Sequence, residues 1–259
     1  MLRARIIPCL LVHRKGLVKT VGFKDPKYVG DPINAVKIFN EKKVDELMVL
    51  DIDATAENRG PNFEMIKNLA QECRMPFCYG GGVTTVEQAK RIIELGAEKV
   101  ALSNAAINNP GLLKEIGDAV GIQSVVVVID VRKKGLLSGG GYDIYVKNGK
   151  EKSSFKLETF IPKLNSIGVG EIVINSIDKD GTMTGYDLSL VQMVRDLTDI
   201  PMTVLGGAGS LEDIRTVISR YKIIGAAAGS LFVFKGKYRA VLINYPNLEE
   251  KFSLLKEAR

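Results

Sequence analysis

The chain contains the same run of segments twice, in the same order. Three segments of its first part recur in its second part: residues 7–16 in 126–135, 45–55 in 170–180, and 75–93 in 200–218. Such a repeat indicates a duplicated unit that cannot bury its hydrophobic face alone. We therefore expect two fused halves, at about 1–120 and 121–245, followed by a C-terminal helix over 247–259.

Each half contains four short apolar runs rich in Val, Ile and Leu, each followed by a polar connection and usually by a helix-like stretch. Runs without polar alternation indicate strands that are covered on both faces. Half a barrel has open sheet edges, so closure by the second copy is expected. The sequence therefore predicts an α/β fold, a (β/α)₈ TIM barrel in one domain over 1–259. Residues 136–160 are expected to form an excursion that contains a small hairpin.

The composition is that of an ordinary soluble enzyme, with 46% hydrophobic and 25% charged residues. The net charge of +6 comes from scattered Lys and Arg, so a small anionic ligand or a docking partner is favoured over nucleic acid. No stretch reaches the roughly 18 apolar residues of a membrane span, and none resembles a signal peptide. Three cysteines without framework spacing indicate reduced thiols. We expect a cytoplasmic protein.

Glycine clusters follow the third and the seventh expected strand, at residues 80–82 and 206–209. The next strand of each half ends in small polar residues, at 103–104 and 229–230. Glycine lets backbone N–H groups turn toward an anion without obstruction by a Cβ atom. A single cluster is more often a tight turn. Two clusters at matched strand ends predict two anion cradles across one barrel mouth, and hence a ligand with a phosphate at each end.

Asp130 ends the fifth expected strand, where side chains of this fold reach the barrel mouth. A carboxylate there can take or give a proton; the alternative is a structural acid paired with a base such as Lys19. The repeat predicts an equivalent acid at position 11, but the chain has Leu11. Leucine cannot transfer a proton, so a mechanism with paired carboxylates cannot run here in the same way.

Further acids and the one histidine lie near the ends of the expected strands. Asp51 and Asp180 are candidate ligand contacts, whereas the repeat-related Asp53 and Asp178 are expected to anchor loops. His13 is expected to be incidental, because one histidine makes no metal site. No metal or organic cofactor is indicated.

Four charged residues open inner strands, and each directly precedes an apolar run: Arg5, Glu46, Lys99 and Glu171. Burying four charges is costly unless they pair. We therefore expect a ring of alternating salt bridges across the barrel floor, with solvated strand ends as the alternative. Such a ring could also gate the interior.

Together these segments resemble HisF, the cyclase subunit of imidazole glycerol phosphate synthase. RIIPCL, the GGG turn, IDVRKKG, SIDKDGTMTGYDL and GGAGS occur in the family's order across essentially the whole chain. The resemblance implies a lyase of histidine biosynthesis in a heterodimer with a HisH-like glutaminase at the bottom of the barrel. Ammonia would pass up the barrel to a bis-phosphate substrate, which yields imidazole glycerol phosphate and an aminoimidazole ribotide.

The resemblance also assigns roles to residues. The catalytic group would be Asp130, with Lys19 as the lysine of a flexible loop. The ammonia gate would be the four charged residues at the strand starts. The substrate phosphates would be bound by Gly82, Ser103, Asn104, Asp180, Gly181, Gly207 and Ser230.

The departures from the family pattern lie at the top of the barrel. Besides Leu11, Asn175 replaces a usual threonine and Leu205 a usual serine, and the first loop differs. Three functions stay open. The first is the cyclase subunit. The second is a paralogue that passes ammonia to a separate amidotransferase in surface-polysaccharide amidino-sugar synthesis, with cyclase activity lost because of Leu11. The third is a non-catalytic scaffold.

Overall fold

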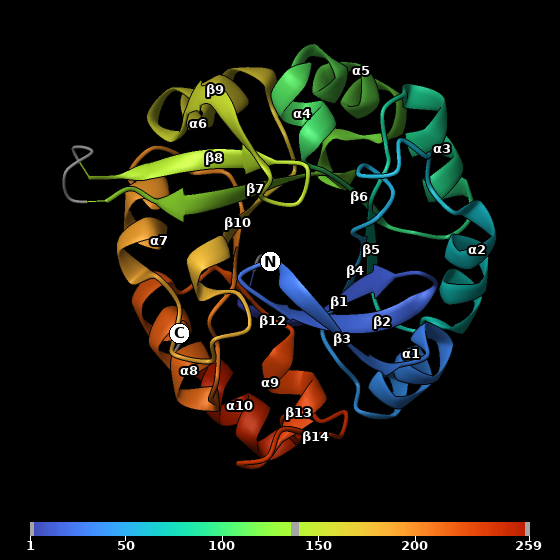
Figure 1. Ribbon diagram of the computed structural model, residues 1–259, viewed down its shortest axis with the longest axis vertical. Coiled ribbons are helices and arrows are strands. Elements are labelled where there is room, and N and C mark those ends of the chain that lie inside the picture. The colour runs from blue at the N-terminus through green and yellow to red at the C-terminus, as the bar shows by residue number, and fades with distance from the viewer. Residues whose placement is uncertain (1–2, 136–139, 257–259) are drawn as a thin grey trace.

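A closed barrel of parallel strands forms the centre of the molecule (Figure 1). The computed structural model describes residues 3–135 and 140–256. In pairing order the barrel strands are β1 (Arg5–His13), β4 (Leu47–Asp51), β5 (Phe77–Gly80), β6 (Lys99–Leu102), β7 (Val125–Lys133), β10 (Glu171–Ser176), β11 (Met202–Leu205) and β12 (Gly225–Ala228). β12 pairs with β1, which closes the sheet. The predicted (β/α)₈ TIM barrel is confirmed, while the domain and repeat boundaries stay predictions.

Helices cover the outside of the barrel (Figure 1). They are α1 (Pro32–Glu41), α2 (Phe63–Glu72), α3 (Val86–Glu94), α4 (Asn104–Asn108), α5 (Gly111–Val120), α6 (Leu157–Ile167), α7 (Leu188–Arg195), α8 (Leu211–Tyr221), α9 (Ser230–Val233) and α10 (Leu248–Lys256), with short 3₁₀ turns η1 (Ile122–Ser124) and η3 (Ile177–Lys179). Thr85 and Ser210 close capping boxes at the starts of α3 and α8, which satisfy orphan backbone N–H groups. Residues 257–259 of the expected C-terminal helix lie outside the described residues.

The barrel strands divide the core into two layers because successive side chains of a strand point to opposite faces. On β1, Ile6 and Leu10 pack outward in the large core between strands and helices. Ile7 and Cys9 point inward, into a smaller cluster that fills the barrel. This double burial explains why the strands are apolar without alternation.

Hairpins extend from the upper ends of two barrel strands. The segment after β1, which the resemblance assigns to a flexible loop that carries Lys19, forms β2 (Gly16–Val21) and β3 (Lys24–Gly30) instead, with Leu11 opposite Val18. The run GLVKTV is rich in β-branched residues, which favours a strand. The hairpin expected before the fifth helix is confirmed as β8 (Tyr142–Val146) and β9 (Glu151–Lys156), although residues 136–139 lie outside the described residues. A short third hairpin joins β13 (Phe234–Lys235) to β14 (Ala240–Val241).

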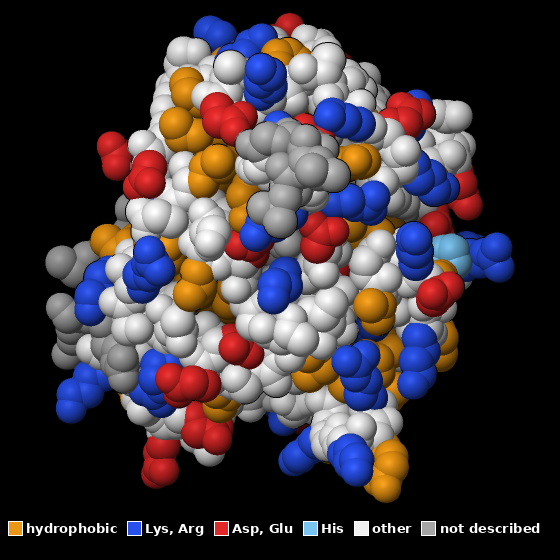
Figure 2. Space-filling view, turned by 60° about the vertical axis from the view of Figure 1, so that its left-hand side comes forward, with side chains coloured by type: hydrophobic (Ala, Val, Ile, Leu, Met, Phe, Trp, Pro, Cys, Tyr) orange, Lys and Arg blue, Asp and Glu red, His pale blue; other side chains and the backbone are white. Residues whose placement is uncertain are grey.

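Lys and Arg side chains are interspersed with Asp and Glu on the face in Figure 2 and form no dense basic stripe there. Within residues 3–135 and 140–256, no helix is long and apolar enough to cross a membrane. In the structure the three cysteines are unpaired, with Cys9 and Cys78 buried and Cys73 half-buried.

Candidate active site

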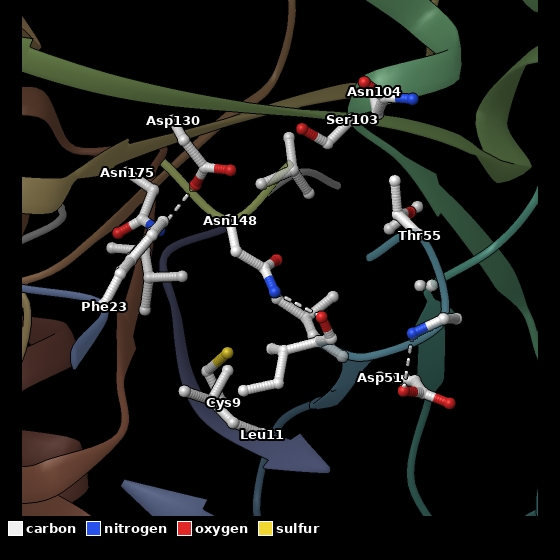
Figure 3. A pocket seen from close by; sticks show the side chains of 18 of the residues that line it. Cys9, Leu11, Phe23, Asp51, Thr55, Ser103, Asn104, Asp130, Asn148 and Asn175 are labelled. Atoms are coloured by element: carbon white, nitrogen blue, oxygen red, sulfur yellow. Dashed lines mark hydrogen bonds between the residues drawn. The ribbon is translucent and has the colours of Figure 1, made fainter. Parts of the chain in front are cut away.

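A cavity of about 500 Å³ opens at the upper end of the barrel. Both halves of the chain line it, through their glycine loops, strand ends and the tips of the first two hairpins. Figure 3 shows Asp130 and Asn175 on one side of this space, Ser103 and Asn104 on another, and Leu11 with Cys9 below. The structure thus brings the expected top-face residues together in one pocket.

The two glycine clusters line this cavity and need glycine for steric reasons. Gly82 has φ of 72°, and a Cβ atom there would lie 2.6 Å from the carbonyl oxygen of Arg59. Gly207 has φ of 113°, and a Cβ atom there would lie 2.3 Å from the carbonyl oxygen of Gly185. Both backbones therefore sit where any side chain would clash.

The clusters lie half a barrel apart, because one follows β5 and the other follows β11 in the closed strand order. Ser103 and Asn104 line the cavity beside the first cluster, and Ser230 beside the second. This arrangement fits a ligand with an anionic group at each end. The phosphate-binding roles of these residues, and of Gly82 and Gly207, stay predictions.

Asp130 lies on the cavity wall at the end of β7. Its Oδ1 accepts a hydrogen bond of 2.8 Å from Asn175 Nδ2. Burial raises the pKa of Asp130 to about 6; hydrogen bonds from Asn175 and Ser103 oppose this rise and the charge of Asp180 adds to it. Since these hydrogen-bond partners are neutral, the structure does not support the alternative of a structural acid paired with Lys19. A carboxyl group with this pKa can exchange protons near neutral pH.

Leu11 presents an aliphatic side chain to the same cavity. It points inward from β1 and packs, with Leu50, on the apolar cluster inside the barrel. Position 11 therefore contributes apolar surface to the cavity floor and no acid.

A lone lysine in a loop is usually solvated, but Lys19 is buried. It lies on β2, is 5% exposed, and donates a hydrogen bond of 2.6 Å from Nζ to the carbonyl oxygen of Cys9. Burial lowers the pKa of the Lys19 amine, against the charge of Asp180. A Cβ atom at Gly229 would lie 2.6 Å from Nζ, so the amine adjoins the small polar pair at residues 229–230. Its catalytic role stays a prediction.

Asp180 anchors the β2–β3 hairpin to the barrel. Its Oδ2 accepts hydrogen bonds from Thr20 Oγ1 at 2.6 Å and from the backbone N–H of Phe23 at 3.1 Å. Burial raises the pKa of Asp180, and the Thr20 hydrogen bond opposes that rise. A Cβ atom at Gly181 would lie 2.0 Å from the carbonyl oxygen of Thr20, so glycine permits this contact. Both residues line the cavity, and their phosphate contacts stay predictions.

Asp51 is held by the protein itself. Arg59 clamps its carboxylate with two hydrogen bonds, of 2.9 and 3.0 Å. Oδ1 of Asp51 also accepts hydrogen bonds from the backbone N–H groups of Asp53 and Ala54. A carboxylate with these partners has little capacity left for a ligand.

Asp53 and Asp178 anchor loops, as the repeat predicts. Asp53 accepts a hydrogen bond of 2.7 Å from the backbone N–H of Arg14, and Asp178 accepts one of 2.7 Å from Lys133. His13 is not incidental, because its Nδ1 lies 2.7 Å from Asp53 Oδ1 and ties the end of β1 to the loop after β4.

The ring of salt bridges at the bottom is confirmed. Arg5 pairs with Glu46 and, at 2.8 Å, with Glu171. Lys99 pairs with the same two acids, at 2.7 and 2.8 Å. Thr203 donates a further hydrogen bond to Glu171. Although burial opposes it, Arg5 and Lys99 hold the pKa of Glu171 below its usual value. The gating role of the ring stays a prediction.

The interior between the ring and the cavity is apolar. Ile7, Met48, Cys78, Val126 and Val173 are among the buried residues of this inner cluster. Such a lining favours a small neutral molecule over an ion.

Sequence reasoning missed three residues that shape the cavity: Phe23, Arg59 and Asn148. Phe23 and Asn148 lie at hairpin tips, and a hairpin pattern does not show which way its tip bends. Arg59 follows an acid-rich strand end, which could have suggested its pairing with Asp51.

A family model described as "Histidine biosynthesis protein" matches residues 5–239. A Vibrio vulnificus protein named provisionally as imidazole glycerol phosphate synthase subunit hisF3 is 54% identical over 99% of this chain and 98% of its own length. A Pseudomonas aeruginosa protein named provisionally as subunit hisF2 is 49% identical over 96% of this chain and 98% of its own length. The imidazole glycerol phosphate synthase subunit HisF of Streptococcus sanguinis is 39% identical over 90% of this chain and 91% of its own length.

Proposed function

Because the chain belongs to the histidine biosynthesis protein family, among relatives named as HisF subunits of imidazole glycerol phosphate synthase, we propose that it is the HisF-type cyclase subunit of a glutamine amidotransferase complex. It receives ammonia from a HisH-like glutaminase, with which it forms a heterodimer, and uses that ammonia on a bis-phosphate substrate. The products are imidazole glycerol phosphate and an aminoimidazole ribotide.

One observation carries this proposal: a closed ionic ring and a cavity lined by both glycine clusters lie at opposite ends of one apolar barrel interior. A neutral ammonia molecule crosses such an interior at lower cost than ammonium. The ring lies where a glutaminase docked at the bottom face would release ammonia. The matched glycine clusters suit a substrate that ends in two phosphates.

Asp130 is the proton-transfer group at the upper end. With a pKa of about 6, it is mostly ionised at neutral pH and can accept the proton that nitrogen loses after ammonia attacks carbon. Asn175 holds its carboxylate at the cavity wall. The Lys19 amine adjoins Gly229, and we expect it to contact a phosphate bound at residues 229–230.

The test is complementation of a histidine auxotroph that lacks HisF, together with turnover of the purified complex. We expect growth, glutamine-dependent turnover in the presence of the glutaminase, and ammonia-dependent turnover without it. No growth, and no turnover from either nitrogen source, would contradict the cyclase assignment.

Leu11 favours a second candidate. The cavity floor at position 11 is aliphatic, and loss of a proton-transfer group commonly lowers a rate by roughly 10²–10⁴-fold. In this candidate the chain is a paralogue that passes ammonia to a separate amidotransferase in surface-polysaccharide amidino-sugar synthesis. Glutaminase stimulation by the chain, with no cyclase product and no complementation, would support it over the first.

A further inference from the structure

The hairpin of β8 and β9 reaches over the mouth of the barrel. It continues from β7, so that Tyr145 pairs with Asp130, and its tip lines the cavity through Lys147 and Asn148. Figure 3 shows the Asn148 carboxamide in the middle of the pocket, between Asp130 on one side and Thr55 on the other. The tip therefore lies over the space that separates the two glycine clusters.

Asn148 contacts the opposite half of the molecule. Its Nδ2 donates a hydrogen bond to the carbonyl oxygen of Ile52, 96 residues away, in the loop after β4. A carbonyl oxygen only accepts hydrogen bonds, so the nitrogen of the carboxamide must face Ile52. The amide is planar, and its oxygen therefore faces away from Ile52, as Figure 3 shows.

The backbone of the tip is held in an uncommon conformation. Lys147, Asn148 and Gly149 have φ of 50°, 58° and 72°. Left-handed backbone costs a lysine free energy and persists only where surrounding contacts fix it. Gly149 packs on the β2–β3 turn, because a Cβ atom there would lie 3.2 Å from Phe23 Cδ2. The two hairpin tips thus support each other over the cavity and fix the direction of the Asn148 side chain.

Resting on the proposed function, we propose that Asn148 binds the segment of the bis-phosphate substrate that joins its two phosphates. The bond to Ile52 fixes the carboxamide, and Oδ1 accepts a hydrogen bond from an O–H or N–H group of that segment. The hairpin thereby recognises a ligand that spans both cradles and ignores a single phosphate ion.

The test compares Asn148→Gly with the wild type, because glycine keeps the left-handed backbone and removes only the carboxamide. With two probes, the family's bis-phosphate substrate and inorganic phosphate, we expect the Kd and KM of the substrate to rise about five- to tenfold, the loss of one hydrogen bond. The Kd of phosphate should change less than twofold. Asn148→Asp should weaken substrate binding further, since a carboxylate cannot donate to Ile52 and repels phosphate. Lys150→Ala, an exposed position in the same turn, is the matched control and should leave both constants unchanged.

Equal substrate binding by the wild type and Asn148→Gly overturns this inference and leaves the proposed function standing. A parallel loss of phosphate and substrate binding also overturns it, because Asn148 would then act on the fold of the cradles. If the wild type itself does not bind the substrate, both the inference and the cyclase assignment fail.

Discussion

Replacing Lys99 by methionine removes one cation from the ring at the bottom of the barrel and keeps most of the side-chain volume. Glu46 and Glu171 are 2% and 3% exposed, and each pairs with both Lys99 and Arg5. The variant leaves two buried carboxylates with Arg5 as their shared cation. Arg5 cannot neutralise both.

The size of the effect follows from this geometry. Removing one partner of a buried ion pair costs about 3–5 kcal/mol. Arg5 retains half of the pairing, and the Lys99 side chain is 18% exposed, so we expect a loss of about 2–3 kcal/mol. For a chain of this size that lowers the Tm by roughly 5–10 °C. Glutamine-dependent turnover should fall relative to ammonia-dependent turnover, because the ring lies on the glutaminase side.

Calorimetry at neutral pH measures the change in Tm. The control is Lys114→Met, which breaks an exposed pair with Asp118 of 67% and 63% side-chain exposure and should cost less than about 0.5 kcal/mol. The pKa of Glu171 is lowered in the folded state, so its contribution is present above its unfolded pKa and is lost as the pH falls through the folded value. The Tm difference from the wild type should therefore shrink in acid. A difference below about 2 °C at neutral pH would refute the closed ring as a buried, coupled unit.

Three further predictions concern the top of the barrel. Asp130→Asn should lower cyclase turnover by roughly 10²–10⁴-fold and abolish the limb of the kcat/KM profile that rises through about pH 6; an unchanged profile would exclude Asp130 as the base. Leu11→Asp should raise cyclase turnover if the missing acid limits it, and should lower the Tm because a carboxylate replaces buried leucine surface. The amount of cyclase product formed measures the first effect. Unchanged product formation would mean that the absence of an acid at position 11 does not limit turnover. Gly207→Ala should weaken phosphate binding at least tenfold in calorimetric titration, because its Cβ atom would lie 2.3 Å from the Gly185 carbonyl oxygen. Gly135→Ala, whose Cβ atom would meet no atom of the described residues within 4 Å, should have no effect.

The parts of the molecule fixed by local pattern could be predicted from the sequence. Apolar runs without polar alternation predict the barrel because its strands are buried on both faces. The charged residue before each of four such runs predicts the ring of salt bridges. The starts of parallel strands all lie at the same end of a barrel, and charges that are buried there must pair. Helix starts such as those at Thr85 and Ser210 are also encoded locally, because each capping box closes within four residues of the chain.

The parts fixed by tertiary contact could not be predicted in this way. Lys19 is buried because the hairpin folds back onto β1, where the Cys9 carbonyl oxygen accepts from its amine. His13 meets Asp53 only when β1 and β4 lie side by side. Asn148 reaches Ile52 across the mouth, and no spacing within either half encodes that contact.

Leu11 and Asp130 together limit the proton transfers that the cavity can perform. The limit concerns whether two transfers can occur in the same step, and it does not remove proton transfer altogether. Two carboxylates allow one to be protonated while the other is ionised, so that proton donation and acceptance occur in the same step. In the proposed function, with Leu11 on the floor, Asp130 performs such transfers in turn. A pKa of about 6 suits that task, because a group that titrates near the working pH is both a usable acid and a usable base. The substitution therefore excludes simultaneous transfer by carboxylates at positions 11 and 130, while sequential transfer by Asp130 stays chemically open to the cyclase function.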